Sequence, residues 1–159
     1  MPVNTTWKLE NFFRPGGEYG PRTKDVYQKK LTYMADRIDA LAPDVVAVQE
    51  VGDPNALTDL AGRLPEIWRT ALSTRPDRRG IRVGFLSRTP VITVGEVTAL
   101  PAPLLPVQVG DDPTDTDGSM GRGALHVRTT VGGLELDLAT AHLKSKLLTY
   151  PGGRFSPRN

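Results

Sequence analysis

The sequence predicts a mixed α/β protein, of either the α+β or the layered α/β type. Helical patterns are confined to the first 65 residues, where the longer one joins two strands in a β-α-β unit. Strand patterns fill most of the rest and end in a hairpin signal at Gly132-Gly133. With 159 residues, the chain is long enough for one domain with a sizeable core and too short for two.

The β-α-β unit comes first. Residues 5–9 have the pattern of a short strand, and residues 23–41 that of an amphipathic helix. Asp25 lies in the first helical turn, and Pro43 follows the last. The apolar positions that recur at helical spacing are Tyr27, Leu31, Met34, Ala35, Ile38 and Leu41.

The strand predicted at residues 45–50 is the centre of the chain's organisation. Its apolar run ends abruptly at Gln49 and Glu50. Alternation would place Val46, Val48 and Glu50 on one face, with Glu50 at the rim of the sheet. A buried carboxylate without a partner costs several kcal/mol, so we expect Glu50 to meet a cation.

The remaining elements follow from turn residues and apolar runs. They are a short helix with Asn55 as N-cap and Pro65 at its end, strands at 67–72, 81–87 and 91–100, a long surface loop at 101–121, and hairpin strands at 124–131 and 134–142.

The composition limits the metal chemistry. The chain has no cysteine, which excludes disulfides and thiolate metal sites, so oxygen or imidazole would have to hold a metal. That donor set favours Mg²⁺ or Mn²⁺. The sequence shows neither a secretory signal nor an apolar stretch that could cross a membrane, and we therefore expect a cytoplasmic protein with no membrane span.

Two basic clusters are candidates for contact with a polyanion. The first is opposed only by Asp77 and contains Arg75, Arg78, Arg79, Arg82 and Arg88. The second follows His142 and contains Lys144, Lys146, Arg154 and Arg158, with no acidic residue. For the first cluster, solvated loop charge is an equally good interpretation.

His142 ends the apolar face of the last predicted strand, next to Lys144. A histidine in this place can donate to a phosphate oxygen or move a proton for it. Taken alone, a histidine at a strand end is more often structural, and His126 is interpreted that way.

Four segments then carry a resemblance to a family. They are residues 6–13 (TWKLENFF), 43–51 (PDVVAVQEV), 82–87 (RVGFLS) and 142–146 (HLKSK). In this order they resemble the endonuclease/exonuclease/phosphatase superfamily, which has the deoxyribonuclease-I-like fold, and the similarity spans essentially the whole chain.

The resemblance implies a four-layer α/β/β/α sandwich and a metal-dependent phosphodiesterase or nuclease. Glu50 matches the family's metal-binding glutamate, and Glu10 the place of an acidic residue that assists the metal in some members. His142 matches a histidine that contacts the scissile phosphate, and the cations expected at the phosphate are Lys8, Arg82 and Lys144. Mg²⁺ or Mn²⁺ is the implied cofactor, and the substrate class (DNA, RNA, inositol phosphate or phospholipid) stays open, with the arginines leaning slightly towards nucleic acid.

The sequence departs from the family pattern in two places. Lys8 stands where the family has asparagine, and it can bind a phosphate oxygen or pair with Glu10 and weaken metal binding. The Asp-x-Asn and Ser-Asp-His segments that should follow residue 146 are absent. We therefore expect residues 1–159 to be the N-terminal part of one domain that lacks its second half, truncated and inactive or weak.

Two expectations accompany a half domain. Sheet edges left exposed would favour self-association or pairing with a complementary chain. The alternative to an enzyme is a non-catalytic remnant that binds polyanions, or a truncated gene product without function.

Overall fold

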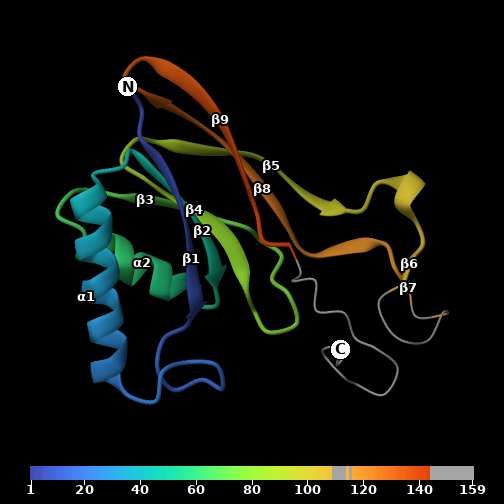
Figure 1. Cartoon of the computed structure of the whole chain (residues 1–159), viewed down its shortest axis with the longest axis horizontal. Helices are drawn as coiled ribbons and strands as arrows, with labels where there is room; N and C mark the ends of the chain where they lie inside the picture. Colours follow the sequence, from blue (N-terminus) through green and yellow to red (C-terminus); the bar gives the residue numbers. More distant parts are fainter. Residues whose placement is uncertain (109–113, 115, 144–159) are drawn as a thin grey trace, which may run out of the picture.

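The computed structural model describes residues 1–108, 114 and 116–143. In this part of the chain, two helices cover one side of a four-stranded sheet and a three-stranded sheet lies on its other side (Figure 1). The helices are α1 (Lys24–Leu41) and α2 (Pro54–Arg63). The first sheet holds, in spatial order, β1 (Asn4–Phe12), β2 (Val45–Val51), β4 (Arg82–Ser87) and β3 (Arg69–Leu72).

The second sheet contains β5 (Val91–Ala99), β8 (Ser119–Val131) and β9 (Leu134–Ala141), in that spatial order. Between β5 and β8 the chain forms a short 3₁₀ helix, η1 (Ala102–Leu104), and a small ribbon of β6 (Val107–Gln108) and β7 (Thr116–Asp117). The surface loop predicted at 101–121 is thus partly structured, and β8 begins five residues earlier than the strand expected at 124.

The predicted β-α-β unit is confirmed. β1 and β2 pair in parallel, and α1 connects them across one face of the sheet. The Thr23 hydroxyl accepts a hydrogen bond from the Val26 N–H and caps the helix, and Ala42 closes it in the left-handed conformation. The predicted hairpin is confirmed as well, since Gly132 and Gly133 take φ values of +56° and +81° between β8 and β9.

The N-cap predicted for the second helix is wrong by two residues. Asp53, not Asn55, precedes α2 with extended backbone, and its carboxylate accepts a hydrogen bond from the Asn55 N–H at 2.9 Å. Pro54 occupies the first helical position, where its missing N–H costs nothing because that group has no partner inside the helix.

Two separate cores hold the layers together. Helices and first sheet meet around Phe12, Leu31 and Val48, each at most 2% exposed. The two sheets meet around Phe85 of β4 and Leu125 of β8, which are 1% and 0% exposed. Burying each such side chain contributes about 1.5–3 kcal/mol, so both interfaces are strongly apolar and fix the sheets face to face.

The mixed α/β class is confirmed, and the described residues contain three of the four layers that the resemblance implies. Within this part of the chain β1 and β3 are the outer strands of one sheet, and β5 and β9 those of the other. Self-association through these edges stays a prediction. No helix in the described ranges is both long and apolar enough to cross a membrane.

We expect Asp53→Ala to lower the free energy of unfolding by about 1 kcal/mol, because α2 loses the side chain that satisfies one of its first N–H groups. Asn55→Ala is the matched control, with an expected change below about 0.5 kcal/mol. Urea denaturation followed by circular dichroism measures both. Equal losses in the two variants would contradict Asp53 as the cap.

Candidate functional site

Glu50 lies where β2 departs from regular alternation. Val46, Val48 and Val51 all pack in the core beneath the helices, so Gln49 and Glu50 are both left for the opposite side. The register of β2 on β4 shifts between Gln49 and Val51, and Glu50 has φ +64°. The bulge turns the Glu50 carboxylate towards the second sheet. The alternation that placed Glu50 on the face of Val46 and Val48 is therefore wrong at this residue.

A second irregularity in β1 holds the carboxylate in place. The pairing of β1 with β2 shifts between Lys8 and Phe12, and Glu10 and Asn11 have φ values of +55° and +51°. The Asn11 N–H donates to Oε2 of Glu50 at 2.9 Å. Left-handed backbone outside glycine costs about 1–3 kcal/mol per residue and is concentrated at functional sites. Three such residues around one glutamate side chain that is only 11% exposed single out this rim of the sheet.

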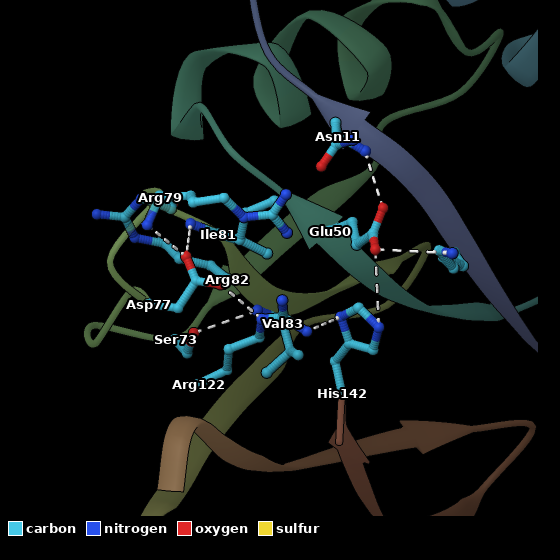
Figure 2. Close-up of polar contacts among 12 residues, drawn as sticks. Asn11, Glu50, Ser73, Asp77, Arg79, Ile81, Arg82, Val83, Arg122 and His142 are labelled. Atoms are coloured by element: carbon cyan, nitrogen blue, oxygen red, sulfur yellow. Dashed lines mark hydrogen bonds and ion pairs between the residues drawn. The ribbon is translucent and has the colours of Figure 1, made fainter. Parts of the chain in front are cut away.

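His142 reaches the same carboxylate from the second sheet (Figure 2). It follows the last residue of β9, and its Nε2 lies 3.7 Å from Oε1 of Glu50. Nearby, the Gln49 amide donates to the hydroxyls of Thr140 on β9 and Thr6 on β1, at 2.9 and 3.0 Å. These contacts tie β1, β2 and β9 together beside the two residues that sequence analysis singled out.

Lys8 supplies a cation for Glu50. Its Nζ lies 3.7 Å from Oε1 of Glu50, and the Lys8 side chain is 57% exposed. Sequence analysis offered Glu10 as a partner of Lys8, but in the structure Lys8 forms this ion pair with Glu50 instead. Because an ion pair made by an exposed ammonium contributes little to the free energy of folding, Lys8 can leave the carboxylate with a small loss of free energy.

Arg122 and Asp77 belong to the site, and sequence analysis named neither of them as a site residue. The Arg122 guanidinium donates from Nη1 to Nδ1 of His142 at 2.8 Å and from Nε to Oδ2 of Asp77 at 2.8 Å (Figure 2). Both side chains are largely buried, with 17% and 15% exposed. No local pattern pairs them, because the contact joins residues 45 positions apart.

The site controls the charge of its ionisable groups. Burial, helped by the charges of Arg122 and Lys8, lowers the pKa of His142 below its ordinary value, against the opposing effect of Glu50 and Asp77. Burial alone would raise the pKa of Asp77, but hydrogen bonds from Arg122 and from the N–H groups of Ile81 and Arg79 outweigh it and hold that pKa low. At neutral pH His142 is therefore mainly uncharged and Asp77 is ionised.

The other predicted site residues are only partly brought to this rim. Arg82 begins β4 opposite Val51, and its Nη1 donates to the Gly80 carbonyl at 2.8 Å. Glu10 is exposed, and its carbonyl accepts a hydrogen bond from Lys30 at 2.7 Å. Lys144 lies outside the described residues. The described residues contain no cluster of three or more histidine, cysteine, aspartate or glutamate side chains that could hold a metal ion, so the metal role predicted for Glu50 and Glu10 stays a prediction.

The first basic cluster is divided by the fold. Arg75, Arg78 and Arg79 are exposed in the segment before β4, close to the rim that carries Glu50. Arg88 lies beyond the far end of β4, where it donates to the Pro43 carbonyl at 2.9 Å and stacks on Trp68. Arg88 therefore serves the packing of the first sheet and is removed from the proposed polyanion surface.

Comparison with known proteins connects this geometry to one fold. No family model matches the chain, and no curated protein matches it in sequence. A structure of humanized TDP2 from D. rerio with 14 mutations matches with a TM-score of 0.54 and 18% identity, over 89% of this chain and 46% of its own. An endonuclease/exonuclease/phosphatase family protein from Leptotrichia buccalis C-1013-b matches with a TM-score of 0.54 and 12% identity, over 91% of this chain and 54% of its own.

These likenesses confirm, at the level of the fold, the resemblance inferred from the sequence. The chain spans about half the length of the solved structures it matches.

Asp77→Asn is expected to lower the free energy of unfolding at pH 7 by about 1–2 kcal/mol, because Arg122 loses its charged acceptor. The Asp77 carboxyl has a lowered pKa in the folded chain, so its contribution is present above the unfolded value of 3.8 and is lost as the pH falls through the folded value. Denaturation at a series of pH values should show the gap between parent and variant closing below pH 3.8. A gap that is constant with pH would contradict this role of Asp77.

Proposed function

Starting from a fold shared with the endonuclease/exonuclease/phosphatase superfamily, we propose that this chain carries part of the active site of a metal-dependent phosphodiesterase of the nuclease kind. The observation that supports it best is the meeting of Glu50 and His142 at one rim, from two different sheets. A buried carboxylate on a bulged strand, facing a mainly neutral histidine, is suited to phosphoester chemistry.

The proposed metal ligand is Glu50, assisted by Glu10. The donor set is compatible with Mg²⁺ or Mn²⁺, because these hard cations accept one or two protein carboxylates and take further ligands from water and substrate phosphate. The Asn11 N–H fixes Oε2 of Glu50. Among the described residues, Oε1 faces only the side-chain nitrogens of Lys8 and His142. A bound cation would neutralise charge that develops on the phosphate.

The chain's own residues would hold the phosphate. His142 would donate from Nε2 to a phosphate oxygen, since that nitrogen faces the carboxylate and Nδ1 is taken by Arg122. Lys8 and Arg82 would add positive charge at the same rim, and Lys144 would follow His142 in the chain. Nucleic acid is the favoured substrate class, because the exposed arginines at 75, 78 and 79 suit an extended polyanion.

A second function is favoured by one contact. The Lys8 ammonium lies 3.7 Å from the carboxylate that would bind the metal. A positive charge held there repels an incoming metal ion. On this alternative the rim binds polyanions without cutting them. The proposals that residues 1–159 are the N-terminal part of a single domain, and that activity is absent or weak in this chain alone, belong with the phosphodiesterase and not with this alternative.

Glu50→Gln is expected to weaken Mg²⁺ or Mn²⁺ binding by roughly tenfold or more, because the amide keeps the size of the side chain and removes the charge that attracts the metal. Isothermal titration calorimetry with the chain and each metal measures this directly. The matched control is Glu135→Gln on the exposed face of β9, which should leave metal binding unchanged.

Hydrolysis of bis(4-nitrophenyl) phosphate gives the second readout, with loss of any metal-dependent turnover expected in Glu50→Gln alone. Unchanged metal affinity in that variant would overturn the metal assignment. Salt-dependent binding of a DNA oligonucleotide with no effect of Mg²⁺ would favour the non-catalytic alternative.

Lys8→Asn is expected to raise the affinity for Mg²⁺, because it removes the positive charge beside Oε1 of Glu50. The effect should diminish with added salt, since the Lys8 side chain is 57% exposed. Lys29→Asn, which removes an exposed lysine paired with Asp25 on α1, controls for the change in net charge. Equal Mg²⁺ affinities for the parent and Lys8→Asn would show that Lys8 does not oppose the metal.

A further inference from the structure

Arg122 has a position that the proposed function does not use. It lies near the start of β8, the central strand of the second sheet, and its side chain extends between the sheets to the loop before β4. Only 17% of that side chain is exposed. A guanidinium so deeply placed needs partners for its donors, and within the described part of the chain these are Asp77 and His142.

Asp77 is a fixed anchor for Arg122. Its Oδ1 accepts hydrogen bonds from the N–H groups of Arg79 and Ile81 at 2.8 and 3.0 Å, so the carboxylate is held by the backbone of its own turn. Oδ2 is then directed to Nε of Arg122 at 2.8 Å. This ion pair neutralises the guanidinium and fixes its plane, which determines where Nη1 points.

Nη1 of Arg122 points at Nδ1 of His142, at 2.8 Å. A guanidinium has only donors, so Nδ1 has to act as the acceptor and cannot carry a proton. The neutral ring must therefore hold its proton on Nε2, the nitrogen that faces Glu50 at 3.7 Å. Among the described residues, the other charged groups that act on the ring are Glu50 from β2, Lys8 from β1 and Asp77 from the turn before β4.

We propose that Arg122 is a positioning residue for His142: anchored by Asp77, it fixes the imidazole as the tautomer that donates from Nε2 into the site. Its hydrogen bond also sets the orientation of the ring about the bond from the end of β9. The inference rests on the proposed function only in that His142 donates to the phosphate.

Direct phosphate binding by Arg122 is a weaker interpretation of the same contacts. Two of its nitrogens are already engaged at 2.8 Å, and Asp77 cancels its charge from inside the protein. A phosphate would have to displace the hydrogen bond to His142 to gain a bidentate contact. A purely structural tie between the sheets predicts the opposite result: the tautomer of the ring would not change when Arg122 is replaced by another bulky side chain in a folded chain.

Long-range ¹H–¹⁵N correlation spectra of the histidine rings test the proposal, because they distinguish a protonated ring nitrogen from an unprotonated one. The full chain is measured at pH 8 with EDTA, so that no metal takes part. We expect Nδ1 of His142 to be unprotonated in the parent chain. Arg122→Met should shift Nδ1 towards an average of the two states, and Arg122→Glu, which supplies an acceptor, should shift it to the protonated range.

Two internal controls accompany these variants. His126, held by Asp137 at 2.7 Å on the outer face of the second sheet, should keep its ring shifts in every Arg122 variant. Arg128→Met, on the same strand but in an exposed ion pair with Asp137, should leave His142 unchanged. Circular dichroism establishes that each variant is folded, and Arg122→Lys, which can still donate, should retain the parent tautomer if Arg122→Met is unstable.

A protonated Nδ1 in the parent chain, or an unchanged Nδ1 in folded Arg122→Glu, would overturn the proposal. Because this spectrum needs neither metal nor turnover, it is independent of the metal-binding and hydrolysis experiments with Glu50→Gln. If the Glu50→Gln experiments fail while the spectra confirm the tautomer, the proposed function is lost. Arg122 then remains the residue that orients His142.

Discussion

The buried carboxylate of Glu50 is the constraint on which the rim of the molecule depends. A glutamate side chain that is only 11% exposed needs hydrogen bonds and cations for its carboxylate, and β1 and the end of β9 provide them through Asn11, Lys8 and His142. Meeting this need requires left-handed backbone at Glu50 and in the adjoining strand. Such backbone persists only where the surroundings over-determine it, and the two apolar cores on either side of the first sheet supply that rigidity.

The charges around Glu50 are of two kinds. Asp77 and Arg122 form a buried pair that is fixed by the turn before β4 and cancels internally. Lys8, in contrast, is exposed and can leave the carboxylate with little loss of free energy. The rim therefore holds one buried negative charge, one mainly neutral histidine and one movable cation, which is an arrangement that a metal ion and a phosphate can enter together.

Local patterns were sufficient for most secondary structure. The spacing of apolar residues predicted α1 and β2, and Gly132-Gly133 predicted the hairpin, because each depends on residues close in sequence. The N-cap of α2 failed although a local signal existed: Pro54 favours the first helical position, which makes Asp53 the cap. The early start of β8 was missed because Ser119 pairs with Ala99 across an interruption of the register, and the glycine-rich local sequence gives no sign of that pairing.

By itself, the sequence determined that Glu50 and His142 stand at the ends of core strands, since an apolar run that stops at a polar residue reports a strand reaching the surface. Only the tertiary structure decided that these two ends meet. It also decided that a bulge turns Glu50 towards the second sheet and that Arg122 and Asp77 stand behind His142. The physical reason is that alternation and propensity act over a few residues, whereas these contacts arise when two sheets pack face to face and bring distant segments to one rim.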